Sequence, residues 1–211
     1  MSPGELLQSV AGYRDFMKAM KEISPVPIEF DEIDGSANGY FSPVKQKIVI
    51  QSGMSQSQTV KTTVHEISHS LLHDKDNVRI EGIDDTVKKT RSSKEVEAES
   101  VAFTVCQHFG IDTSEYSFGY VAGWSSGKEM KELKSSMETI RKTASRLIGD
   151  IETKVHELQK NRLMDLEAQL LVSNKMRDVL GVKEQKMQVG ERSGIELYQG
   201  KVAHQKRSIM R

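Results

Sequence analysis

The stretch HEISHSLLH, residues 65–73, is the most informative part of this sequence because it contains the pattern HExxH. On a helix, residues four apart lie on the same face, so His65 and His69 can present two imidazole nitrogens to one metal ion. Glu66 projects beside that pair, where its carboxylate can hold a metal-bound water. The pattern therefore predicts the minimal arrangement of a zinc hydrolase.

The residues around this pattern predict a helix over residues 55–73, with Ser55 or Ser57 as its N-cap. His73 would end the helix, because a cation is favourable near a helix C-terminus and the polar residues 74–77 are typical of a turn. Apolar side chains recur at helical spacing and mark a buried face that differs from the face of the histidines: Val60, Val64, Ile67 and Leu71.

Two ligands from one helix do not complete a catalytic zinc site, so a third protein ligand is needed. The metzincin pattern HExxHxxGxxH is excluded, because Leu72 and Lys75 stand where it requires Gly and His. His73 is one turn beyond His69, but three consecutive turns of a straight helix do not converge easily on one ion. A carboxylate further along the chain is the remaining candidate.

Residues 93–110 predict a second helix, with an apolar face and with Gly110 as its C-terminal stop. Glu95 and Glu99 lie four residues apart on one face of it. One of them can bind the metal while the other accepts the outer N–H of a ligand histidine. We interpret Glu97 as part of a solvated charged face, although the spacing alone does not decide which glutamate is the ligand.

HEISHSLLH together with EVEAESVAF, which begins at Glu95, resembles the ImmA/IrrE-type zinc metallopeptidases. The narrower resemblance, over about residues 16–151, is to the zincin domain found with ArdC-like antirestriction proteins of bacterial mobile elements. It implies an α+β, zincin-like fold in which a small sheet accompanies the active-site helix and the glutamate helix. It also implies one Zn²⁺ held by His65, His69 and Glu95, with Glu66 as the general base.

The remaining patterns predict a helix over residues 4–22 that ends before Pro25, a strand over 28–33, and a hairpin of 40–41 with 47–51. Residues 48–50 lack polar alternation, so this strand is either buried on both faces or lies at a sheet edge. By the resemblance, an extended substrate would pair with an edge near residues 47–51.

We expect a metallopeptidase core over residues 1–127, a helical extension over 128–180 and a polar, basic, mobile tail over 181–211. Residues 75–93 are polar and predict a loop that borders the cleft. Tyr116 or Tyr120, with Tyr120 preferred, could donate a hydrogen bond to the oxyanion of a tetrahedral intermediate. The extension predicts two long helices, around 128–158 and 161–180, which either pair within the chain or form a homo-oligomer with another copy.

Composition narrows the setting in which the protein acts. Thirty basic and thirty acidic side chains give a formal net charge of zero, so nucleic acid is not an expected partner of this chain alone. The one cysteine, Cys106, excludes an internal disulfide framework, and its apolar neighbours predict a buried position. A signal peptide or membrane span is not indicated, so we expect a cytoplasmic location.

We therefore predict a zinc-dependent endopeptidase that hydrolyses peptide bonds in a cytoplasmic protein, such as a regulator in a mobile element. The alternative is a non-proteolytic antirestriction or interaction module that retains the fold and the metal. A further alternative is a structural zinc closed by His73 as a fourth ligand. The retained Glu66 argues against both alternatives, because neither needs a base at this position.

Overall fold

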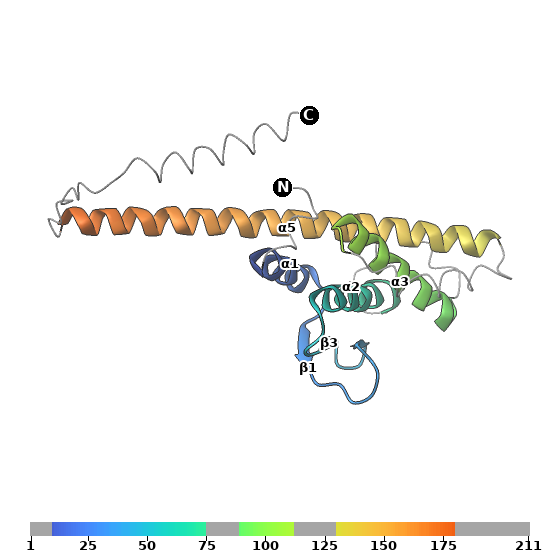
Figure 1. Cartoon of the computed structure of the whole chain (residues 1–211). Coiled ribbons are helices and arrows are strands. Elements are labelled where there is room, and N and C mark those ends of the chain that lie inside the picture. Colours follow the sequence, from blue (N-terminus) through green and yellow to red (C-terminus); the bar gives the residue numbers. More distant parts are fainter. Residues whose placement is uncertain (1–9, 75–88, 112–129, 180–211) are drawn as a thin grey trace, which may run out of the picture. The chain divides into compact units, whose positions relative to one another are not determined.

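The computed structural model describes residues 10–74, 89–111 and 130–179, which form four helices and one three-stranded sheet (Figure 1). The predicted α+β class is thereby confirmed. The chain divides into two compact units, Met1–Met164 and Asp165–Arg211, and the sheet and the core both belong to the first. Within the described ranges, no helix has an apolar stretch that is long enough to cross a membrane.

The sheet consists of β1 (Ile28–Asp31), β2 (Gly39–Ser42) and β3 (Lys47–Gln51), in the order β1-β3-β2. β3 pairs in parallel with β1 and in antiparallel with β2, which confirms the predicted hairpin. Residues 48–50 of β3 are buried, so their lack of alternation reflects burial on both faces. The prediction that this strand offers an edge to substrate is wrong, because strands flank β3 on both sides.

Helix α2 (Gln56–His73) is the predicted active-site helix. The side chain of its N-cap, Ser55, accepts a hydrogen bond from the backbone N–H of Gln58 at 3.2 Å, and the helix ends at His73, as predicted. The predicted apolar face is buried and packs against α3, α1, β2 and β3. The histidines lie on a different face of α2, which is turned toward Glu95 of α3.

Helix α3 (Arg91–His108) is the predicted glutamate helix, and it begins two residues earlier than expected. Thr90 is its N-cap and accepts a hydrogen bond from the backbone N–H of Ser93. Residues 75–88 of the predicted loop lie outside the described residues, whereas residues 91–93 form the first turn of α3. Cys106 is fully buried, and burial raises its pKa to about 12, as expected for a packing side chain.

Helix α1 (Val10–Ile23) ends before Pro25, as predicted, while residues 4–9 of the predicted helix lie outside the described residues. Its Phe16 packs edge-to-face on Phe109, with ring centroids 4.8 Å apart. This contact joins α1 to the C-terminal end of α3 in the core.

Helix α5 (Met130–Val179) is one continuous helix, so the prediction of two successive helices is wrong. Residues 158–161 contain neither Gly nor Pro, so no strong helix breaker interrupts α5 there. Within the first unit, one face of α5 enters the same core as α1, α2 and α3: Ala144, Leu147, Ile151 and Val155. The predicted boundary at residue 127 and the tail 181–211 lie outside the described residues.

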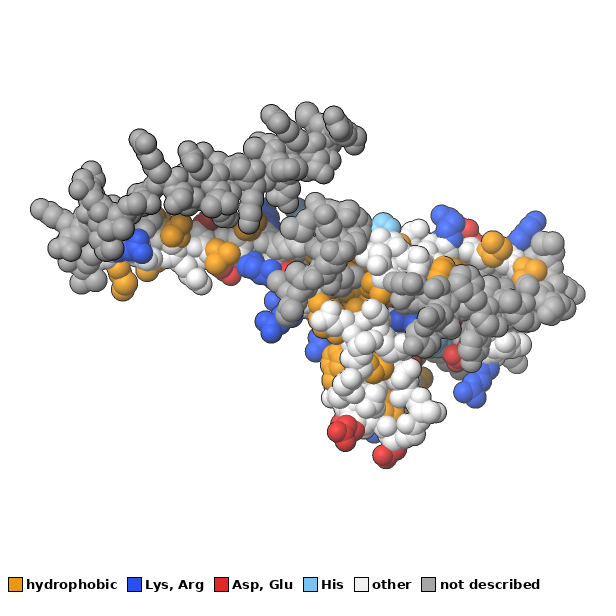
Figure 2. Space-filling view, viewed as in Figure 1, with side chains coloured by type: hydrophobic (Ala, Val, Ile, Leu, Met, Phe, Trp, Pro, Cys, Tyr) orange, Lys and Arg blue, Asp and Glu red, His pale blue; other side chains and the backbone are white. Residues whose placement is uncertain are grey.

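In the second unit the described residues are 165–179, the C-terminal part of α5. Figure 2 shows hydrophobic side chains at the surface of this end of the helix. Several of its large apolar side chains are exposed: Leu166, Leu170, Leu171, Val172 and Met176.

Gly39 of β2 provides a test of the packing between the sheet and α2. A Cβ at this position would lie 2.7 Å from Cγ2 of Thr62, so Gly39→Ala should lower the free energy of unfolding by about 1–3 kcal/mol. Chemical denaturation measures this loss. Adding Thr62→Ser removes the opposing methyl group and should restore part of the stability; a double variant no more stable than Gly39→Ala would contradict the contact.

Candidate metal centre

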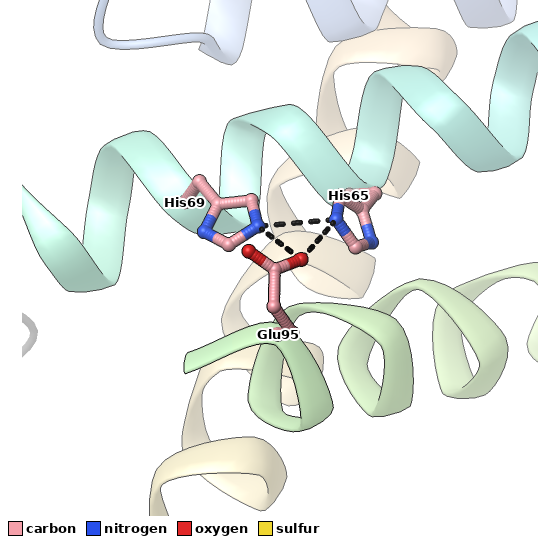
Figure 3. Close-up of side chains that lie close together, drawn as sticks. All are labelled: His65, His69 and Glu95. Atoms are coloured by element: carbon pink, nitrogen blue, oxygen red, sulfur yellow. Dashed lines mark hydrogen bonds and ion pairs between the residues drawn. The ribbon is translucent and has the colours of Figure 1, made fainter. Parts of the chain in front are cut away.

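Three predicted ligand side chains come together where α2 faces α3 (Figure 3). His65 Nε2 and His69 Nε2 are 3.1 Å apart. Glu95 Oε2 lies 3.6 Å from His65 Nε2 and 3.5 Å from His69 Nε2. Within residues 10–74, 89–111 and 130–179, this is the one group of three such side chains that could hold a metal ion.

The distances between these donor atoms fit a tetrahedral zinc ion. Ligands that bind zinc at about 2.0–2.1 Å in a tetrahedral arrangement are separated from one another by about 3.3 Å. The three observed separations, 3.1, 3.5 and 3.6 Å, lie on either side of this value. Two imidazole nitrogens and one carboxylate oxygen are also typical zinc donors, and they leave one coordination position for water or substrate.

Burial and nearby charges separate the pKa values of the ligand side chains. Burial opposes the charged form of His65, but its hydrogen bonds with Glu95 and Glu99 outweigh this effect and raise its pKa to about 9. Burial and the charge of His65 lower the pKa of His69 to about 4. The hydrogen bond with His65 is the main reason that the pKa of Glu95 falls to about 2. Glu95 is therefore ionised at neutral pH, as a metal ligand must be.

Glu99 contacts the other nitrogen of the His65 ring. Its Oε2 lies 3.2 Å from His65 Nδ1, and its Oε1 lies 2.7 Å from Lys61 Nζ. A carboxylate that accepts the Nδ1 proton leaves Nε2 as the atom that can bind metal. Of the two glutamates predicted to share one face of α3, Glu99 is thus the one that contacts the ring nitrogen of His65 that faces away from the donor triangle.

Lys61 is the residue of this site that the sequence analysis missed. It precedes His65 by four residues, the same spacing that separates His65 from His69, so all three side chains lie on one face of α2. The spacing of four residues from Lys61 to His65, and again from His65 to His69, is the signal that could have identified Lys61 as part of the site.

Glu66 is buried, with 7% of its surface exposed, and burial raises its pKa. The charge of His65 and a hydrogen bond from the backbone N–H of Phe41 in β2 partly oppose that shift. Glu66 and the three ligand side chains line a cavity of about 920 Å³, whose other wall is formed largely by residues 36–41. The base and the ligands therefore face one common space.

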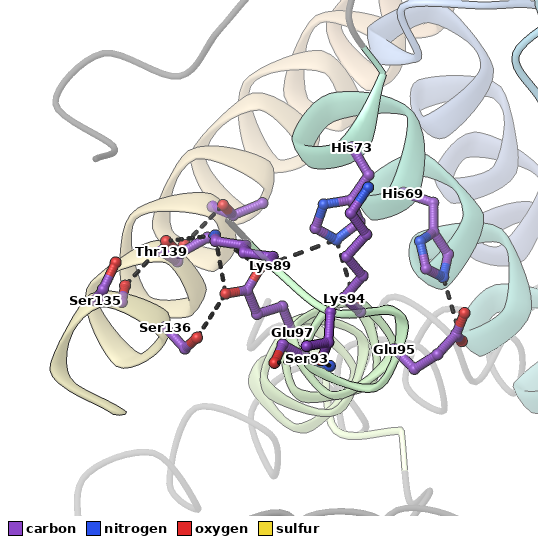
Figure 4. Close-up of polar contacts among 12 residues, drawn as sticks. His69, His73, Lys89, Ser93, Lys94, Glu95, Glu97, Ser135, Ser136 and Thr139 are labelled. Carbon is purple, nitrogen blue, oxygen red and sulfur yellow. Dashed lines mark hydrogen bonds and ion pairs between the residues drawn. The ribbon is translucent and has the colours of Figure 1, made fainter. Parts of the chain in front are cut away.

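His73 turns away from the donor triangle (Figure 4). Its Nε2 lies 3.3 Å from the carbonyl oxygen of Lys94, to which it can donate a hydrogen bond. Burial, followed by the positive charges of His69 and Lys94, lowers the pKa of His73 to about 3. This histidine is therefore neutral at physiological pH, and its packing matches the predicted helix end.

The prediction that Glu97 lies on a solvated face is wrong, because its side chain is fully buried. Lys89 Nζ lies 2.9 Å from it, and the Ser136 hydroxyl donates a hydrogen bond to it at 2.7 Å (Figure 4). Helix α5 covers this face of α3. A buried carboxylate needs hydrogen-bonding or cationic partners, and Ser136 of α5 is one of the two that Glu97 has. Glu97 consequently links α3 to α5 and is not a metal ligand.

Tyr116 and Tyr120 lie outside the described residues, so an oxyanion role for either tyrosine stays a prediction.

A 117-residue part of the chain is similar to an uncharacterized protein of Bacillus anthracis. The two sequences are 32% identical over this part, which covers 55% of the chain. The same part covers 18% of the relative, so the chain spans about a fifth of that protein's length. No protein-family model matches the sequence, and no solved structure matches it. These comparisons give no function, so a proposal of function depends on the chemistry of the site.

The ligand set can be tested by substitution of single side chains. Glu95→Gln should weaken zinc binding by at least about 100-fold. Losing a residue that binds the metal should reduce affinity at least as much as losing a residue that only hydrogen-bonds to a ligand. His73→Gln, which changes a neighbouring buried side chain outside the triangle, should leave zinc affinity nearly unchanged. Competition with a chromophoric chelator measures both dissociation constants. Equal losses in the two variants would contradict the assigned ligands.

Proposed function

We propose that this protein is a zinc-dependent endopeptidase of the HExxH type, with a zincin-like core similar to that of the ImmA/IrrE-type metallopeptidases. The observation that carries the proposal is the donor triangle of His65, His69 and Glu95, whose dimensions fit zinc. Glu66 lies beside this triangle and faces the same cavity. A general base next to an open metal position is the arrangement that hydrolysis needs.

In the proposed reaction the metal and Glu66 have different roles. When bound, the zinc ion makes water more acidic and polarises the carbonyl group of the scissile peptide bond. Glu66 removes a proton from the attacking water and returns it to the leaving nitrogen. Burial favours the protonated form of Glu66 and thereby helps it to keep the proton between these two steps.

The outer edge of β2 is the surface that would hold an extended peptide. The Gln51 N–H donates to the Asn38 carbonyl at 2.9 Å, and hydrogen-bonded pairs alternate along antiparallel strands. The backbone groups of Gly39 and Phe41 therefore point away from β3. The Phe41 N–H donates a hydrogen bond to Glu66, so the Gly39 groups and the Phe41 carbonyl are the ones that can pair with a peptide. Both residues line the cavity, so a peptide that adds a strand here would pass the ligands. Among the described strands, none pairs with this edge of β2, so a peptide bound here could continue at both ends, which favours an endopeptidase.

A closed structural zinc site is less well supported than a catalytic one. Such a site requires four protein ligands, whereas three side chains converge within the described residues. His73, which would have been the fourth ligand, contacts the Lys94 carbonyl instead. We propose a cytoplasmic protein as substrate, such as a regulator in a bacterial mobile element, by analogy with the family that the sequence resembles.

The decisive comparison is between the wild type and Glu66→Gln, both loaded with zinc. The variant should bind the same amount of zinc but lose about 10²–10⁴-fold in peptide hydrolysis, because it cannot accept a proton. Metal analysis and mass spectrometry of a broad peptide library measure the two properties. Equal zinc content with no wild-type cleavage beyond that of the variant would instead favour a non-proteolytic module.

A further inference from the structure

We propose that Lys61 is a positioning residue of the metal centre, which acts through Glu99 to hold His65 in the orientation that binds metal. The inference rests on the metal site of the proposed function, although it does not require that the protein cleaves peptides. It concerns a residue of α2 that lies outside the donor triangle.

The contacts form a chain from Lys61 to the ligand nitrogen. Lys61 Nζ lies 2.7 Å from Glu99 Oε1, while Glu99 Oε2 lies 3.2 Å from His65 Nδ1. Each carboxylate oxygen therefore faces a different partner. Lys61 and His65 are one helical turn apart on α2, and Glu99 reaches between them from α3.

Burial makes the orientation of Glu99 depend on Lys61. Both side chains are almost fully enclosed, with 7% of each residue exposed. Removing one partner of a buried ion pair leaves the other charge uncompensated, which is strongly destabilising. With Lys61 holding Oε1, Oε2 stays directed at Nδ1 and the His65 ring stays fixed, with Nε2 toward the other ligands. Without Lys61, both oxygens could turn, and the ring would lose its fixed support.

A second buried lysine in the same core provides a matched control. Lys89 lies 2.9 Å from Glu97, with 13% of the lysine side chain and none of the glutamate side chain exposed. Both pairs join a lysine to a glutamate of α3. Glu97, however, contacts α5 through Ser136, and the histidine paired with its carboxylate is His73, at 3.9 Å, which lies outside the donor triangle. Removing Lys89 therefore disturbs a comparable ion pair without disturbing a ligand.

The test measures the zinc dissociation constant of the full chain by competition with a chromophoric chelator. Lys61→Met should weaken zinc binding by about 10–100-fold, the usual effect of losing an outer partner of a ligand. Lys61→Arg keeps the charge and should lose less zinc affinity than Lys61→Met. Lys89→Met should lower the thermal unfolding temperature but change zinc affinity by less than about twofold. Circular dichroism establishes that each variant is folded.

Glu99→Gln shows whether Lys61 acts through Glu99. This variant should weaken zinc binding, and adding Lys61→Met to it should change the dissociation constant by less than about twofold, because the two residues belong to one chain of contacts. The double variant also removes both buried charges together, so it can be measured even if Lys61→Met alone does not fold.

Three results would overturn the proposal. The first is a folded Lys61→Met protein that binds zinc as the wild type does. The second is an equal loss of affinity in Lys61→Met and Lys89→Met, which would show a general packing effect. The third is a full additional loss when Lys61→Met is combined with Glu99→Gln. Wild-type protein that binds no zinc would remove both this proposal and the proposed function, whereas zinc binding without proteolysis would remove only the peptidase activity.

Discussion

The candidate metal centre depends on a single packing constraint, the simultaneous approach of Glu95 and Glu99 to opposite nitrogens of the His65 ring. Glu95 lies 3.6 Å from Nε2 and Glu99 lies 3.2 Å from Nδ1. Because the two glutamates are one helical turn apart, both contacts require α3 to keep one position along the side of α2. A shift of α3 by one residue would remove both. The apolar contacts between these helices therefore also determine the geometry of the ligands.

The same packing explains how a helix so rich in carboxylates can lie in a protein core. Each of the three glutamates of α3 has its own cationic or hydrogen-bonding partners: Glu95 has the ligand histidines, Glu97 has Lys89 and Ser136, and Glu99 has Lys61 and His65. Burying a carboxylate without such a partner would cost several kcal/mol, on the order of the net stability of a small domain. The polar network consequently stabilises the fold and orients the site at once.

Local features of this fold could be predicted from the sequence, and features that depend on distant segments could not. The limits of α2, its buried face and the meeting of His65 with His69 follow from spacing within one helix. The same rule places Glu95 and Glu99 on one face of α3, whereas the choice of Glu95 as a ligand rests on the family resemblance. By contrast, Glu97 is buried because Ser136, 39 residues away, belongs to a helix that covers it. β3 is central because β1, which precedes β2 in the chain, pairs on its other side. Neither relation leaves a periodic pattern in the sequence.

The most direct test of a three-ligand catalytic site is a crystal structure of the zinc-loaded protein, with anomalous diffraction recorded at the zinc absorption edge. We expect one anomalous peak within about 2.0–2.2 Å of His65 Nε2, His69 Nε2 and a Glu95 oxygen, with a fourth ligand that is not protein. A peak at another position, or an ion closed by a fourth protein side chain such as His73, would contradict this expectation.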